Sequence, residues 1–179
     1  HPGLMRFAEY AKKRGVMRLA VETNGQKLDG ETVRELFAEG LDFLILNMNA
    51  MASNVTDCET RVEDILAIRD EFRSAGNRPF PRVILQVINS NAAAATLDRV
   101  YDRFHYLVDR IVITPFDTFR GRIPYDGVID FTPMNRMPCR RLIDTLFVLS
   151  DGTIGLCGEF FDGVFPEFSV NAMSIGEIS

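Results

Sequence analysis

The sequence predicts an α/β protein with a parallel sheet, followed by a small β-hairpin that lies between two cysteines. Apolar stretches of strand length alternate with amphipathic helical stretches through residues 1–115. The strand stretches are apolar throughout, which is typical of strands buried on both faces. Strand–helix–strand repetition also requires parallel pairing with right-handed crossovers. The sheet is therefore either an open doubly wound sheet or part of a (β/α) barrel.

Each expected element has its own signal in the chain. The expected helices lie around residues 4–14, 30–39, 62–76 and 97–108, and the expected strands around 19–21, 43–46, 83–88 and 111–113. Gly15 and Gly76 are placed to stop the first and third helices. Asp29 suits the N-cap of the second helix, and Gly40 suits its C-terminal end.

The C-terminal part of the chain is expected to form a hairpin between two thiols. Residues 146–149 and 153–156 have strand length, and Asp151-Gly152 between them suits a type I′ turn. Cys139 precedes the first strand, and Cys157 lies on the returning strand. Such a hairpin aims two sulfurs at one point, which is how a chain begins to hold a metal or an iron–sulfur cluster. Two buried thiols without a ligand are the alternative.

Composition excludes several classes of function. The net charge of −5 and the pI of about 5.1 leave no basic surplus for nucleic acid or for an acidic membrane surface. The longest apolar runs have strand length, so we expect no transmembrane helix. The start, His1-Pro2-Gly3, leads into a helix almost at once, so we expect no signal peptide. Three cysteines, at positions 58, 139 and 157, argue against a disulfide scaffold and favour a reducing, cytoplasmic compartment.

Polar side chains gather where the expected strands end. Such ends form the ligand-binding edge of parallel α/β sheets. The residues there are Glu22, Thr23, Asn24 and Gly25; Asn47, Met48 and Asn49; Asn89, Ser90 and Asn91; and Thr114, with Gln86 inside the third strand. With His1 and His105 as the only histidines, hydrolase triads are poorly supported, and a G-x-G-x-x-G loop is absent. This edge predicts a small-molecule site, with ordinary loop composition as the alternative.

Two motifs carry a resemblance to a known family. The spacing C-x12-G-x4-C, formed by Cys139, Gly152 and Cys157 with Pro138 before it, resembles the opening of a SPASM domain. Thr23-Asn24-Gly25 after a strand, and the terminal segment 173–178, are similar to further segments of radical S-adenosylmethionine (radical SAM) enzymes with that domain. The resemblance implies a partial radical SAM (β/α) barrel over residues 1–122, a linker over 123–138, and the start of an auxiliary iron–sulfur module over 139–179.

The family's activity is carried over as an expectation. The resemblance implies an oxidoreductase with S-adenosyl-L-methionine and 4Fe-4S clusters as cofactors, and a 5′-deoxyadenosyl radical that abstracts hydrogen from a peptide or small-molecule substrate. Flavodoxin or ferredoxin would be the electron donor. The residues implied to contact the cofactor are Thr23, Asn24, Asn47, Gln86, Asn89 and Thr114. Cys139 and Cys157 are implied to bind an auxiliary cluster, and Cys58 is expected to be a structural thiol.

The sequence also departs from the family. It lacks the C-x3-C-x2-C loop and the Gly-Gly-Glu-Pro motif. We therefore expect an enzyme truncated before His1, with no catalytic residues and no activity in this chain alone, and with auxiliary-cluster ligands completed beyond Ser179. A non-catalytic, degenerate α/β binding or scaffold domain is the alternative. A small zinc protein is the third possibility, although zinc needs about four ligands.

Overall fold

A computed structural model describes residues 3–49, 55–76, 79–119, 121–130, 139–158 and 165–174. The chain divides into two compact units. The first contains the chain up to residue 116 together with residues 127–129, and the second contains residues 117–126 together with the chain from residue 130 onward. Each unit is described by itself.

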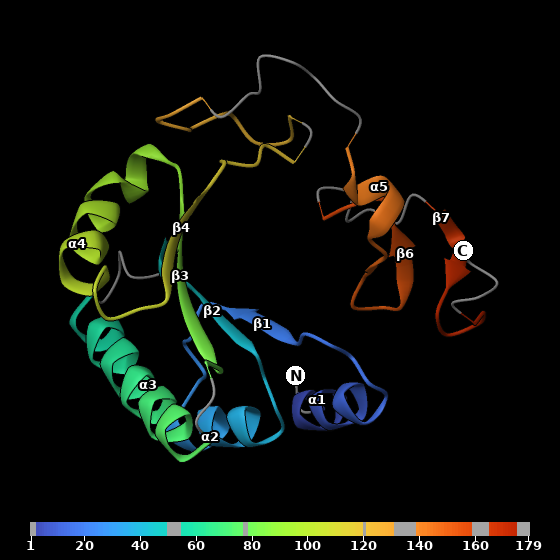
Figure 1. Ribbon diagram of the computed structural model, residues 1–179. Helices are drawn as coiled ribbons and strands as arrows, with labels where there is room; N and C mark the ends of the chain where they lie inside the picture. The colour runs from blue at the N-terminus through green and yellow to red at the C-terminus, as the bar shows by residue number, and fades with distance from the viewer. Residues whose placement is uncertain are drawn as a thin grey trace. The chain divides into compact units, whose positions relative to one another are not determined.

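The first unit is built on a four-stranded parallel sheet, which confirms the α/β class (Figure 1). Its strands are β1 (Ala20–Thr23), β2 (Phe43–Asn47), β3 (Arg82–Ile88) and β4 (Arg110–Thr114). They lie side by side in the order of the sequence, and each adjacent pair is parallel. All four carboxyl ends therefore meet at one edge of the sheet.

The helices of this unit match the expected ones, but the third begins at residue 55 rather than near 62, and the fourth ends at residue 104 rather than near 108. They are α1 (Leu4–Lys13), α2 (Gly30–Ala38), α3 (Val55–Gly76) and α4 (Ala94–Phe104), with the short 3-10 turn η2 (Asn91–Ala93) before α4. Asp29 caps α2 as expected, accepting a hydrogen bond from the Thr32 amide at 2.8 Å. Gly40 follows the end of α2 with φ +88°, a conformation that favours glycine. Among the described residues, no helix has the length and apolar character needed to cross a bilayer.

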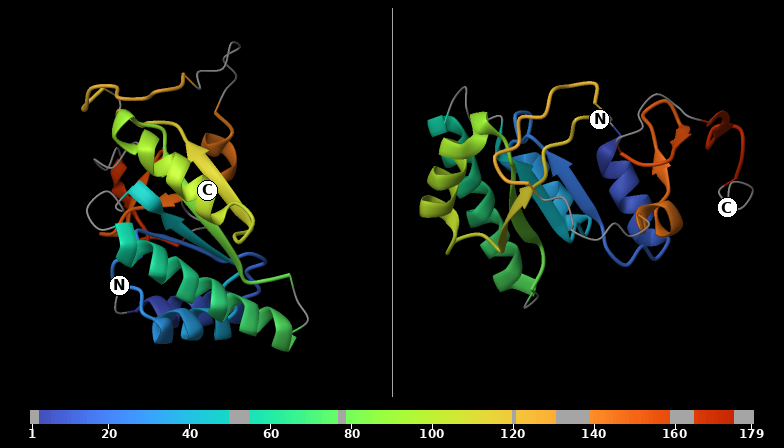
Figure 2. Two further views of the ribbon diagram at one scale, coloured as in Figure 1. Left: turned by 90° about the vertical axis from the view of Figure 1, so that its left-hand side faces the viewer. Right: turned by 90° about the horizontal axis from the view of Figure 1, so that it is seen from above.

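One face of the sheet is covered by helices. Because the strands follow one another in sequence order, right-handed crossovers place the connecting helices on the same side. Side chains from α2, α3 and α4, including Leu36, Ile65 and Phe104, join a single core cluster with Leu44 and Leu85 of the sheet. Figure 2 shows α3 and α4 lying over this side of the strands. We call it the covered face.

The opposite face is only half-buried, so the expectation of burial on both faces is wrong. Exposure alternates along β2 and β3, with every second residue fully buried on the covered face. β1 is an edge strand with no buried residue, although the sequence predicted a buried strand there. We call this side the open face. Its residues are Ala20, Glu22, Phe43, Ile45, Asn47, Arg82, Ile84, Gln86, Ile88, Arg110, Val112 and Thr114.

Ion pairs hold the amino edge of the sheet. Asp42, just before β2, accepts hydrogen bonds from Lys12 Nζ at 2.5 Å and from the Leu19 amide at 2.8 Å. Burial raises the pKa of Asp42, but these hydrogen bonds and the charges of Lys12 and Arg18 outweigh it and leave the pKa below its ordinary value. Asp109, before β4, likewise accepts from the Val83 amide at 2.9 Å.

A buried carboxylate joins the two helices over β3 and β4. Glu59 of α3 receives Arg99 Nε of α4 at 2.7 Å, and Arg103 Nη1 lies 3.4 Å away. The hydrogen bond from Arg99 is the main reason that the pKa of Glu59 lies below its ordinary value; burial opposes it, and the charge of Arg103 reinforces it. Glu59 therefore ties α4 to α3 across the covered face.

The second unit contains the expected hairpin with a different turn. Helix α5 (Arg141–Asp144) precedes an antiparallel sheet of β5 (Phe147–Val148), β6 (Thr153–Gly155) and β7 (Phe165–Ser169). The Gly152 amide donates to Leu149 O at 2.9 Å, and Leu149 N donates to Thr153 O at 2.8 Å. Gly152 has φ +89°, whereas Asp151 does not have the positive φ that a type I′ turn requires. The loop is thus a three-residue turn ending in a glycine bulge.

Candidate functional site

The polar residues singled out in the sequence lie at the carboxyl edge of the sheet. Thr23, Asn47 and Thr114 end β1, β2 and β4, and Asn24 and Asn89 follow β1 and β3 directly. In the sheet register, Thr23 pairs with Leu46, Asn47 with Gln86, and Ile88 with Thr114. The expected gathering at a single edge is confirmed.

These residues divide between the two faces of the sheet. Asn47, Gln86 and Thr114 belong to the open face, and Thr23 belongs to the covered face. The Thr23 hydroxyl accepts a hydrogen bond from the Gly25 amide at 3.1 Å, which fixes the loop after β1. Thr23 therefore has a structural task on the helix side of the sheet.

Three asparagines at this edge are engaged by the backbone. Asn24 Oδ1 accepts from the Gln26 amide, and Asn47 Oδ1 from the Asn49 amide, both at 3.1 Å. Asn89 uses both ends of its amide: Nδ2 donates to Ile129 O at 2.6 Å, and Oδ1 accepts from Ile129 N at 3.1 Å. Asn89 therefore fastens residues 127–129 to the edge of the sheet.

Asn49 and Ser90, for which ordinary loop chemistry is the alternative to a ligand site, also have structural partners. Asn49 Oδ1 accepts from the Ile88 amide at 2.7 Å. Ser90 Oγ accepts from the Ala93 amide at 3.2 Å and caps η2. These bonds support the local interpretation of both residues.

A carboxylate–amide pair lies on the open face near the carboxyl edge. Gln86 Nε2 of β3 donates to Glu22 Oε1 of β1 at 2.9 Å, across the intervening strand β2. Asn47 of β2 is the sheet neighbour of Gln86. Sequence reasoning left the role of Glu22 open. The available signal was its polarity within a strand that leads into the Thr-Asn-Gly segment.

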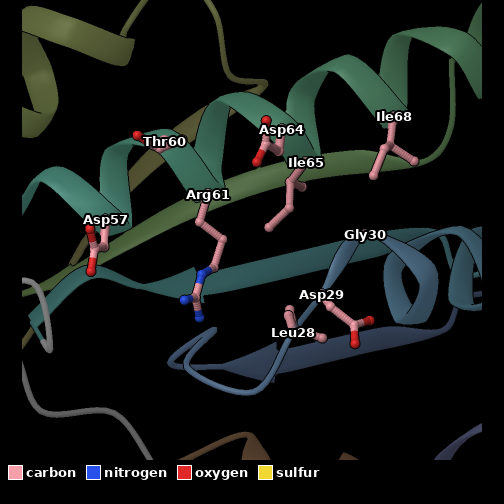
Figure 3. A pocket seen from close by; sticks show the side chains of 9 residues that line it. All are labelled: Leu28, Asp29, Gly30, Asp57, Thr60, Arg61, Asp64, Ile65 and Ile68. Carbon is pink, nitrogen blue, oxygen red and sulfur yellow. The ribbon is translucent and has the colours of Figure 1, made fainter.

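A hollow of about 430 Å³ lies on the helix side, between α3 and the loop before α2 (Figure 3). Arg61 extends from α3 toward this loop and donates a hydrogen bond to Gly25 O. Asp29, Asp57 and Asp64 also line the hollow. Asp29 is already the N-cap of α2, and Arg61 holds the loop through its bond to Gly25 O, so Asp29 and Arg61 have structural tasks.

The cysteines lie in different settings. Cys139 is exposed and lies two residues before α5, and Cys157 is half-buried and lies two residues past β6 rather than on the returning strand. Cys58 lies in the first turns of α3 and packs against the core, and a structural thiol remains the expectation for it. Within the described ranges, no group of three or more His, Cys, Asp or Glu side chains is arranged to hold a metal ion.

The sequence was compared with those of known proteins, and a similar protein was found. No protein-family model matches the chain. An "Uncharacterized protein" of Treponema pallidum (strain Nichols) is 25% identical over 175 residues, a match that covers 89% of this chain and 48% of that protein. The chain thus spans about half the length of the curated relative it matches.

Proposed function

We propose that this chain supplies part of the active site of a radical SAM enzyme, with its sheet forming part of a (β/α) barrel. The observation that carries the proposal is the open face. A parallel sheet with all its covering helices on one side has the arrangement of barrel strands, whose uncovered side would face the interior. Glu22, Asn47, Gln86 and Thr114 lie toward the carboxyl edge of this face, where such folds bind their ligands, while Arg82 and Arg110 lie at its amino edge.

The side chains of the open face suit S-adenosylmethionine by their chemistry. Glu22 and Gln86 offer oxygens that accept hydrogen bonds, and Asn47 and Thr114 offer donors. The cofactor carries an ammonium group, ribose hydroxyls and an adenine amino group as matching partners. When bound, it supplies the radical that abstracts hydrogen. The task of these side chains is to bind and orient it, and the bond from Gln86 holds the Glu22 carboxylate in position.

The described residues do not complete an iron–sulfur site. A 4Fe-4S cluster is held by four thiolates, and Cys139 and Cys157 supply two. Among the described residues, no third His, Cys, Asp or Glu side chain joins the two cysteines to form a metal-binding group. Both cysteines remain candidate ligands of an auxiliary cluster, and no reaction step is assigned to them.

A binding or scaffold domain is the second candidate, because the edge amides have structural uses. Asn24 and Asn47 each accept a backbone hydrogen bond, and Asn89 is engaged at both ends of its amide. In this alternative the open face contacts another macromolecule rather than a cofactor.

Titration calorimetry with S-adenosylmethionine separates the two candidates. We expect saturable binding to the wild-type chain. Glu22→Gln and Gln86→Ala should each weaken it about tenfold to a hundredfold, the loss expected for one hydrogen bond to a charged group. Glu31→Gln and Gln26→Ala are matched controls because both residues are exposed and lie off the open face. Absence of binding, or equal losses in the controls, would contradict the cofactor site and favour the scaffold.

A further inference from the structure

A small pocket lies where β3 and β4 reach the carboxyl edge. It has a volume of about 130 Å³ and is lined mainly by apolar groups. These include Val87, Ala93, Leu97, Ile113, Val128 and Ile129. An apolar cavity of about 150 Å³ stays dry and accepts a molecule the size of benzene. The pocket therefore has room for an aliphatic group of about four to six carbons.

Val128 and Ile129 form the roof of this pocket, and we call residues 127–129, to which they belong, the strap. The chain on both sides of the strap belongs to the second unit, whereas the strap itself belongs with the sheet. Asn89 is only 7% exposed, and its amide bonds both the N–H and the C=O of Ile129. A buried amide with two bonds to one residue fixes the roof more firmly than a single contact would.

The mouth of the pocket is apolar and accessible. Val128 is 54% exposed, Ile129 50% and Ile113 38%. Neighbouring exposed aliphatic side chains around a hollow are typical of a binding site, since protein interiors otherwise fill such spaces.

One carboxylate gives the pocket a charge preference. Asp98 lines it, and no hydrogen bond or ion pair of its side chain is found among the described residues. The nearby cations are already engaged, because Arg99 and Arg103 bond Glu59. Asp98 therefore leaves a negative charge beside an apolar cavity.

We propose that the pocket under the strap binds a short aliphatic group that ends in a cation. The group comes either from a free alkylamine or from a side chain such as lysine in a peptide. The inference goes beyond the proposed function, because binding here needs neither S-adenosylmethionine nor an iron–sulfur cluster. Failure of one therefore leaves the other standing.

Methyl NMR of the whole chain tests the proposal with 3-methylbutylamine as the probe. We expect saturable shifts at the methyl groups of Ile113 and Ile129. 3-Methylbutanoate has the same apolar body with the opposite charge, so it should bind at least tenfold more weakly. A lysine-containing tripeptide that competes with the amine would identify a peptide as the source, and a tripeptide that does not compete would identify the free amine.

Paired variants locate the binding. Ala94 lines the pocket and Ala95 does not, and both are exposed at the start of α4. Ala94→Leu should weaken amine binding at least tenfold, while Ala95→Leu should change it less than twofold. Asp98→Asn should weaken it about fivefold, consistent with one surface ion pair, and Asp102→Asn should not. Absence of shifts, equal binding of amine and acid, or equal effects within either pair would overturn the proposal.

Discussion

The two faces of the four-stranded sheet are built from the same strands but differ in how deeply their side chains are buried. On the covered face Leu44, Val83 and Leu85 are fully buried under the helices. On the open face their chain neighbours Ile45 and Ile84 are half-buried. The open face also carries the Gln86–Glu22 hydrogen bond, whereas the core cluster is made of hydrophobic side chains.

This difference assigns most of the folding stability to the covered face and leaves the open face available for binding. Burial of apolar surface is the main stabilising contribution to a fold, so the covered face holds most of the stability of the unit. A face that stays accessible contributes less stability, and its polar side chains remain available to a ligand. Substitutions that are one residue apart in a strand should therefore have different effects.

The largest expected contrast is between Leu85→Ala and Ile84→Ala. Leu85 is 0% exposed, so its truncation leaves a cavity and should lower the free energy of unfolding by about 3–4 kcal/mol. Ile84 is half-buried on the open face, and its truncation should cost about 1 kcal/mol. Urea unfolding followed by circular dichroism measures both. Equal losses would show that the open face is as tightly packed as the covered face.

Local signals predicted much of this architecture. The apolar strands, the Asp29 cap and the Cys139–Cys157 hairpin each depend on a few adjacent residues or on a fixed spacing, which a sequence displays directly. The apolar run at 43–46 could not reveal that alternate side chains face a half-open side, because Phe43 and Ile45 are as hydrophobic as the buried leucines between them. Burial depends on what covers a strand.

The long-range contacts of the candidate site were equally hidden. Gln86 and Glu22 are 64 residues apart in the chain, and Asn89 and Ile129 are 40 residues apart. No local spacing indicates either pair. The carboxyl edge could be predicted, but the division of its residues between two faces required the register of the strands.

A smaller effect concerns how the covering helices are held, and it depends on pH. Glu59→Gln should lower the free energy of unfolding by about 1–2 kcal/mol at neutral pH, because Arg99 and Arg103 lose a buried charged partner. Since the folded-state pKa of Glu59 is lowered, its stabilisation is present above the unfolded-state pKa. It is lost as the pH falls from that value through the folded-state pKa.

Urea unfolding between about pH 3 and pH 7 checks this sign, because unperturbed glutamate titrates near 4.3. Wild type and Glu59→Gln should converge in stability toward the acid end. The control is Glu63→Gln, whose carboxylate is 47% exposed and should contribute less than about 0.5 kcal/mol. A stability difference that grows on acidification would contradict the ion-pair explanation.

The smallest expected effect distinguishes the two faces at the carboxyl edge itself. Thr23→Val removes the hydroxyl that accepts from the Gly25 amide on the covered side, so it should cost about 0.5–1 kcal/mol in stability. Because Thr23 does not belong to the open face, the same change should alter S-adenosylmethionine affinity less than twofold.

For Thr114→Val we expect the reverse, a loss of S-adenosylmethionine affinity with little change in stability. Thr114 lies on the open face, and its hydroxyl is 3.5 Å from Val87 O, at the limit for a hydrogen bond. Its loss should therefore weaken binding about threefold while stability stays within 0.5 kcal/mol, as expected for a surface change. Calorimetric titration and urea unfolding of both variants measure the four values. If Thr23→Val proves to be the variant with weaker binding, the carboxyl edge binds its ligand from the helix side, and the open face loses its assigned role.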